Sequence, residues 1–185
     1  KGGKWVVAKN SPLGRRITAN TFMRVSGPAA GHALLQTREF MITDTASVPT
    51  GGTSNGRVAH GTVNNCAHGI TPWGTYLTCE ENWNGNFGGT GAVDTSTATE
   101  IGKLNRRYGV SAAGFGYRWH TTDPRWDVST NPHEPHLFGW VVEIDPYDPS
   151  SIPVKRSGFA VSDPGNRLIP VALQQLDAGA LPRPR

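Results

Sequence analysis

TYLTCEE, at residues 75–81, and FGWVVEID, at residues 138–145, are the two runs with the clearest strand pattern in this chain. Both contain β-branched and aromatic residues, which favour extended strands. Weaker strand-like runs lie at residues 4–9, 21–25 and 57–63. Turn-forming residues separate these runs, at residues 11–12, 49–52, 54–56, 84–90 and 146–153. The pattern predicts many short strands joined by turns.

The composition agrees with a strand-rich fold. Gly (23) and Pro (14) make up a fifth of the 185 residues, and charged residues only 17%. This excludes a coiled coil, a helical bundle and a charge-rich disordered chain. The sequence predicts one short helix, over residues 29–37 after Pro28. We therefore expect an all-β fold with long Gly/Pro-rich loops, and no repeat of 40–50 residues decides between sandwich, barrel and propeller.

Charge and hydropathy limit the partners that we expect. The net charge is +4, but the basic residues form no continuous run, so we expect no nucleic-acid interface. No stretch of 18 apolar residues occurs, so we expect no membrane contact. The chain begins at Lys1 without a signal peptide, and we expect that a leader or an upstream segment was removed, with any export signal.

Three carboxylates lie in the two strongest strand patterns. Side chains alternate along a strand, so Glu80 and Glu81 are expected to point to opposite faces, where they can serve different partners. Glu143 lies in an apolar run, and an ionised carboxylate buried there needs a charge partner. A metal ion would supply that charge, and the alternative is a strand end where Glu143 reaches solvent.

The two cysteines leave three possibilities open. Cys66 and Cys79 could form a disulfide in an exported protein, remain as buried inert thiols, or bind a metal. Their spacing of 13 residues matches no zinc-finger pattern, and no CxxC motif occurs. His68 lies beside Cys66 in a run of small and polar residues, where an exposed loop histidine is the simpler interpretation.

Three blocks of the sequence resemble the PhoX-type alkaline phosphatases. NNCAHGITPWGTYLTCEEN, at residues 64–82, resembles the family signature NNCAGG–TPWGT–LTCEEN. NPHEPHLFGWVVEIDPYDPSSIPVKR, at residues 131–156, is similar to a second block, with RYG and YRWH upstream of it. GPAAGHALL, at residues 27–35, is similar to a third, and together the blocks span residues 20–156.

The resemblance implies a partial β-propeller, with several blades of antiparallel strands, and a metal site containing iron (Fe³⁺) and calcium (Ca²⁺). It implies a hydrolase that acts on phosphate monoesters at alkaline pH, in the periplasm or outside the cell. By position, Cys66 matches an iron-binding cysteine, Glu81 a calcium ligand and Glu143 an iron-binding glutamate. Asn65 and Glu80 lie in the same motifs, as residues that could support the metals or contact substrate. Thiolate and carboxylate ligands together suit such a mixed site.

The sequence also departs from the family pattern. His68 stands where the family usually has Gly, and the resemblance ends after Arg156. We therefore expect a PhoX-like portion at residues 1–156 and a divergent tail at residues 157–185, which is poorly ordered or forms at most a short helix at 171–176. The later glutamate and the phosphate-binding arginine of the family have no counterpart here. A propeller that does not close would leave open sheet edges, which favour self-association.

Two other classes of function remain open at this stage. One is a non-catalytic β-rich fragment that binds calcium or a partner, and the missing downstream residues favour it. The other is a different propeller hydrolase, such as a calcium-dependent lactonase. Those sites lack a cysteine ligand, so iron bound by Cys66 would distinguish them.

Overall fold

The computed structural model describes residues 3, 6–42, 47–157, 161–162 and 168–169. Its strands are β1 (Phe22–Ser26), β2 (Arg38–Ile42), β3 (Ser47–Thr53), β4 (Val58–His60), β5 (Asn65–Ile70), β6 (Tyr76–Glu80), β7 (Val141–Ile144), β8 (Val154–Arg156), β9 (Val161–Ser162) and β10 (Leu168–Ile169). Its helices are α1 (Glu100–Tyr108) and the 3-10 helices η1 (Ala33–Leu35), η2 (Trp83–Asn86), η3 (Trp119–Thr121), η4 (Pro124–Trp126) and η5 (Glu134–Leu137). The expected boundary after residue 156 and the expected helix at 171–176 lie largely or wholly outside the described residues.

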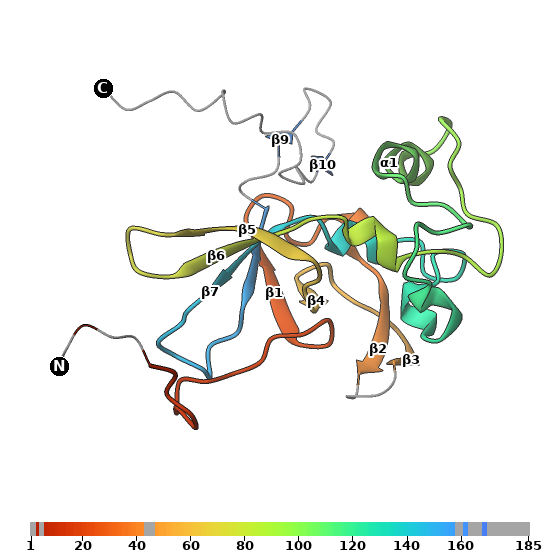
Figure 1. Cartoon of the computed structure of the whole chain (residues 1–185). Helices are drawn as coiled ribbons and strands as arrows, with labels where there is room; N and C mark the ends of the chain where they lie inside the picture. The colour runs from red at the N-terminus through yellow and green to blue at the C-terminus, as the bar shows by residue number, and fades with distance from the viewer. Residues whose placement is uncertain (1–2, 4–5, 43–46, 158–160, 163–167, 170–185) are drawn as a thin grey trace.

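One mixed sheet of six strands organises the described part of the chain. Its order is β4-β1-β8-β7-β6-β5, and in Figure 1 these strands fan out on the side away from α1. Strands β2 and β3 form a separate ribbon, as do β9 and β10. The all-β class is confirmed, with little helix. The described residues close no propeller, and β1 and β8 pair in parallel where only antiparallel neighbours were expected.

The two strongest strand patterns in the sequence lie side by side as β6 and β7. Leu77 pairs with Glu143 and Cys79 pairs with Val141 in an antiparallel register. Directly paired residues share a face, so the alternation read from the sequence holds on both strands. Glu143 therefore lies on the face of the sheet that carries Leu77.

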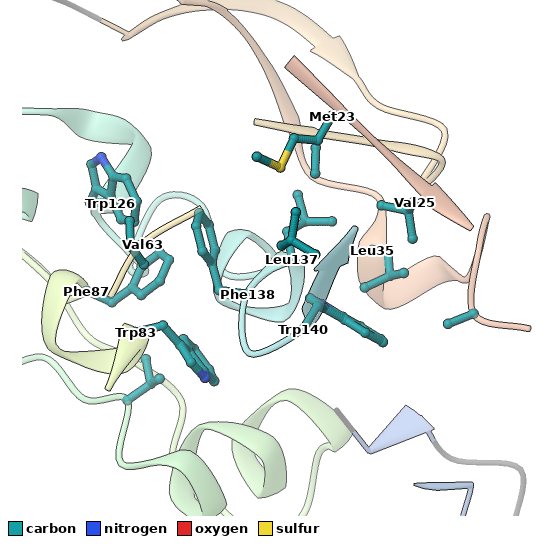
Figure 2. Packing of buried hydrophobic residues seen from close by; sticks show 14 of the residues in the cluster. Met23, Val25, Leu35, Val63, Trp83, Phe87, Trp126, Leu137, Phe138 and Trp140 are labelled. Carbon is teal, nitrogen blue, oxygen red and sulfur yellow. The ribbon is translucent and has the colours of Figure 1, made fainter. Parts of the chain in front are cut away.

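Aromatic rings fill the core beneath the sheet. The rings of Phe87, Trp126 and Phe138 contact one another with centroids 5.0–5.5 Å apart, and Figure 2 shows them gathered together. All three side chains are at most 2% exposed. Aromatic rings at such distances add to the gain from burial. The residue after η2, a residue of η4 and the segment before β7 thus share one core with residues of the sheet.

A buried ion pair ties the loops to this core. Arg125 Nε lies 2.5 Å from Glu134 Oε1. The same guanidinium donates to the carbonyl oxygens of Ala19, at 2.8 Å, and of His60. One cation therefore satisfies buried oxygens from η5, β4 and the segment before β1, where unpaired groups would be costly.

The α-helix was not expected from the sequence, although its ends carry recognisable signals. Thr99 caps its first turn by accepting a hydrogen bond from Gly102 N, and Gly109 ends it with φ +71°. A capping threonine and a terminal glycine are typical helix boundaries. No helix in the described residues is both long enough and apolar enough to cross a membrane.

Three local predictions were wrong. Residues 6–9 of the expected strand at 4–9 have no strand partner, and Val6 and Val7 are exposed. Residues 49–52 lie inside β3, although Pro and Gly indicated a turn. The expected helix at 29–37 is reduced to the single turn η1. In each case pairing or burial, and not local propensity, decides the structure.

Candidate functional site

Cys66 and Glu81 meet at one end of the β5–β6 hairpin. The register slips between Asn65 and His68, which is a bulge in β5, and Glu81 N donates to Asn64 O at 3.1 Å just beyond β6. A bulge redirects side chains at a strand end. Here it leaves the Cys66 thiol exposed and hydrogen-bonded to the Glu81 carboxylate.

This contact holds the thiol in its neutral form. The hydrogen bond to Glu81 raises the pKa of Cys66, and burial and the negative charge of Glu81 act in the same direction. A carboxylate that accepts a proton from a thiol stabilises the thiol against ionisation. A cation placed between the two groups would reverse this balance, because thiolates and carboxylates both bind cations.

Glu143 is held by three side chains at the other end of the strand pair. Its Oε1 accepts from Trp73 Nε1 at 2.8 Å and from Thr75 Oγ1 at 2.6 Å. Its Oε2 pairs with Arg156 Nε at 2.5 Å. Burial alone would raise the pKa of Glu143, but the bonds from Thr75, Trp73 and Arg156 outweigh it and lower the pKa. The carboxylate is therefore ionised, and Arg156 supplies its charge partner in this structure.

The described residues do not bring the three predicted ligands to one point. Glu143 pairs with Leu77, four residues before Glu81 on the same face. A strand advances about 3.3 Å per residue, so the Cα atom of Glu81 lies roughly 13 Å along the chain direction from that of Leu77, the partner of Glu143. Within the described ranges no group of three or more His, Cys, Asp or Glu side chains could hold a metal ion. Cys66 and Glu81 fit as two members of a donor set, while Glu143 stands apart.

Glu80 points away from Glu81, as alternation predicts, and into the core. Its Oε1 lies 2.8 Å from Lys155 Nζ, and its Oε2 accepts from Trp140 N at 3.0 Å. Both carboxylate oxygens are thus paired inside the protein. Asn65 exchanges hydrogen bonds with Thr62 Oγ1 at 2.8 and 3.1 Å. The roles expected for Glu80 and Asn65 toward metal or substrate stay predictions.

The two cysteines are not joined. Cys66 is exposed and Cys79 is buried, and both are free thiols. Burial raises the pKa of Cys79, and the charge of Glu80 adds to this effect. Cys79 therefore behaves as a small apolar side chain, whereas Cys66 remains available to a ligand.

Two cationic residues of this region were missed by sequence reasoning. Lys155 and Arg156 both lie on β8, whose three residues show no clear strand pattern. A signal for them was present in the sequence. A buried glutamate needs a cation nearby, and Lys155 and Arg156 are adjacent cations at the end of the block that contains Glu143. Because side chains alternate along β8, Lys155 and Arg156 point to opposite faces of the sheet, where they pair with Glu80 and Glu143.

A pocket of about 420 Å³ opens beside Glu143. It is lined by Ile70, Thr71, Pro72, Trp73, Leu77, Glu143 and Arg156. The lining comes from the β5–β6 hairpin and from the Glu143–Arg156 pair. The pocket thus joins a charged pair to an apolar surface.

Comparison with known proteins identifies the family. The sequence model of alkaline phosphatase PhoX matches residues 1–160, so the chain belongs to the PhoX alkaline phosphatase family. Among solved structures it is similar to Pseudomonas fluorescens PhoX in complex with vanadate, a transition state analogue, with 45% identity and a TM-score of 0.71. The match covers 86% of this chain and 24% of that chain, so the present chain spans about a quarter of its relative. No curated protein matches.

Proposed function

We propose that this chain carries part of the site of a metal-dependent phosphomonoester hydrolase, an alkaline phosphatase that uses iron and calcium. The contact between the Cys66 thiol and the Glu81 carboxylate carries the proposal, together with membership of the family. Sulfur suits iron and carboxylate oxygen suits calcium. Two donors of different softness at one bulge fit the edge of a mixed metal site.

The proposed roles follow the chemistry of each side chain. Cys66 would hold iron through its sulfur and Glu81 would hold calcium through its oxygens, while Glu143 would hold iron once it exchanges Arg156 for the metal. Glu80 and Asn65 would support these ligands from neighbouring positions. When bound, such cations neutralise the phosphate charge and stabilise the leaving oxygen.

The residues of this chain prepare the ligands for that role. The bulge at Cys66 places the thiol at the surface and beside Glu81. Trp73 and Thr75 both donate to Oε1 of Glu143, which fixes the carboxylate in one orientation. Fixed ligands lose little freedom on binding a charged group.

The metal content of the purified, unchelated chain tests this proposal. We expect iron and calcium in near-integer ratio to protein by elemental mass spectrometry, and hydrolysis of a phosphate monoester at alkaline pH. Cys66→Ala should lose iron and activity, whereas the matched control Cys79→Ala should retain both. Iron or full activity retained in Cys66→Ala would contradict the proposed role of the thiol.

A second candidate is a non-catalytic β-rich protein that binds calcium or a partner. The separation of Glu143 from the Cys66–Glu81 pair favours it, because the described residues assemble no set of three ligands. Calcium without iron, and no hydrolysis, would support this candidate. Calcium with hydrolysis of a lactone would point instead to the other propeller hydrolases, and visible absorbance from thiolate-bound iron would exclude them.

The family also supports three broader proposals. The six-stranded sheet would form part of a β-propeller, and the protein would work in the periplasm or outside the cell. Strand β5 lies at an edge of the sheet, and residues 65–68 and 70 are exposed. An exposed edge strand can pair with another chain, so self-association through β5 is proposed as well. Sedimentation of the purified chain over a range of concentrations measures it.

A further inference from the structure

Trp73 is an exposed indole that is nevertheless fixed in place. Trp73 is 70% exposed, and its indole Nε1 donates to Glu143 Oε1 at 2.8 Å. An exposed tryptophan normally keeps several rotamers. Here a hydrogen bond to a buried carboxylate holds the ring in one of them, with a large apolar face still open to contact.

Other apolar side chains continue the surface that this ring begins. Ile70 is 79% exposed, and Pro72 and Leu77 also line the pocket of about 420 Å³. Ile70 and Leu77 come from neighbouring strands of the hairpin, and Trp73 comes from the turn between them. Exposed apolar residues gathered in one concave place mark a binding site more often than scattered ones do.

The pocket lining also contains a charged pair. Arg156 pairs with Glu143 Oε2, and 38% of the Arg156 side chain remains exposed. Arg156 Nη1 also donates to Ser26 Oγ at 3.2 Å, and the remaining guanidinium N–H groups suit an anionic oxygen. The pocket lining therefore offers a cation to an anionic group and apolar side chains to an apolar group.

We infer that this pocket binds the apolar, aromatic ester group of a phosphate monoester, with Trp73 as the flat platform on which that group stacks. The inference rests on the proposed function, because Glu143 is there a ligand beside the phosphoryl group. The phosphate would lie near Glu143 and Arg156, and the ester group would extend over Trp73, Ile70 and Leu77. A substrate with both features, an anion joined directly to a ring, matches the charged and the apolar residues of this lining.

Binding of two phosphonates, which cannot be hydrolysed as esters, tests this without any need for turnover. Phenylphosphonate and methylphosphonate share the anion and differ in the ring. Burial of roughly 60 Å² of ring surface at about 25 cal/mol per Å² predicts about tenfold tighter binding of phenylphosphonate. Isothermal titration calorimetry on the purified, unchelated chain measures both affinities, with inorganic phosphate as the anion alone.

Variants locate the site of the preference. Ile70→Ser should reduce the preference for the phenyl compound by roughly threefold, from about half of that apolar contact, and leave methylphosphonate unchanged. Trp73→Ala should abolish the preference. The matched control Val48→Ser replaces an exposed apolar residue of β3 outside the pocket and should change neither affinity.

Each other outcome overturns the inference in a recognisable way. Equal binding of both phosphonates would contradict binding of the ring in this pocket, without contradicting the proposed function. Failure of both phosphonates and of inorganic phosphate to bind would remove the proposed function as well. A preference that survives in Ile70→Ser and Trp73→Ala would place the ring elsewhere. A dimer that dissociates on Ile70→Ser would assign this face to a second copy of the chain.

Discussion

Lys155 Nζ lies 2.8 Å from Glu80 Oε1, and neither side chain reaches solvent. The pair joins β8 to β6 across the intervening strand β7. Lys155 also donates to Leu137 O at 2.7 Å and lies 4.2 Å from the centre of the Phe138 ring. Burial lowers the pKa of Lys155, and the charge of Glu80 opposes that shift. The buried charge of Lys155 is thus stabilised by the carboxylate of Glu80.

Removing the lysine should strongly destabilise the protein. In Lys155→Met the Glu80 carboxylate loses its cation in a buried place, and we expect the free energy of unfolding to fall by about 3–5 kcal/mol. Urea denaturation followed by tryptophan fluorescence measures the change.

The double variant Glu80→Gln/Lys155→Met is the matched control. It removes both charges and keeps an acceptor for Trp140 N, so it should cost less than Lys155→Met alone. A cost equal to the sum of the two single variants would show that the charges are not coupled.

The thiol of Cys66 should ionise more easily when its carboxylate partner is neutralised. The hydrogen bond to Glu81 raises the pKa of Cys66, so Glu81→Gln should lower that pKa and speed alkylation by iodoacetamide near pH 8. The rate measured from pH 6 to pH 10 gives the pKa in each variant.

A Cys79→Ala background removes the second thiol from this experiment. Glu100→Gln is the control for a general loss of negative charge, since Glu100 lies on α1 away from the hairpin. An unchanged alkylation profile in Glu81→Gln would show that the two side chains do not interact in solution.

Acid should destabilise the fold through His136. Burial, helped by the charge of His133, lowers the pKa of His136 to about 4, whereas an unfolded histidine titrates near 6.5. Between these values the unfolded chain binds the proton and the folded chain does not. The contribution of His136 to the free energy of unfolding is therefore complete above pH 6.5. It falls by up to about 3 kcal/mol as the pH falls toward 4.

His136→Leu tests this assignment. Its free energy of unfolding, measured by denaturation at pH 7.5, 6, 5 and 4, should fall less steeply than that of the unaltered chain. His68→Asn changes an exposed histidine and should leave the slope unchanged. The same slope in His136→Leu would assign the acid sensitivity to other groups.

Gly61 cannot carry a side chain. Its φ is +77°, and a Cβ built there would lie 1.8 Å from Ala19 O. Gly51 has a similar φ of +85° but no atom within 4 Å of such a Cβ. Gly51→Ala should cost about 1 kcal/mol from backbone strain alone, and Gly61→Ala at least about 2 kcal/mol more. Thermal and urea unfolding compare the pair, and equal costs would show that the backbone at Ala19 moves away.

Local pattern predicted four strands of the sheet and missed β5 at one edge and β8 near its centre. Strands β4, β6 and β7 fall within runs whose alternation or β-branched residues mark them, and β1 overlaps such a run in all but its last residue. Strand β5 contains Gly, Asn and a bulge, so its sequence looks like a tight bend. Its strand form comes from pairing with β6. Strand β8 is likewise defined by its neighbours, because three residues carry too little pattern.

The candidate site was predictable in its residues and not in its arrangement. Alternation correctly separated Glu80 from Glu81, and the apolar run around Glu143 correctly indicated a need for a charge partner. The sequence did not reveal that Arg156 is that partner in this structure, because the two meet only through the pairing of β7 with β8. The ligand roles of Cys66, Glu81 and Glu143 stay predictions that metal analysis will decide.

The parallel pairing of β1 with β8 has a consequence for synthesis. Arg24 lies opposite Val154, 130 positions later in the chain. At about 5–20 residues per second, β1 leaves the ribosome roughly 6–26 s before its partner exists. Of the two strands that pair with β1, only β4 is made early. The edge of β1 that later pairs with β8 therefore stays unpaired during this time, beside Met23 and Val25. Strand β8, which lies between β1 and β7, is therefore the last of the six strands to join the sheet. Until then, a chaperone or a second nascent chain can bind the open edge of β1.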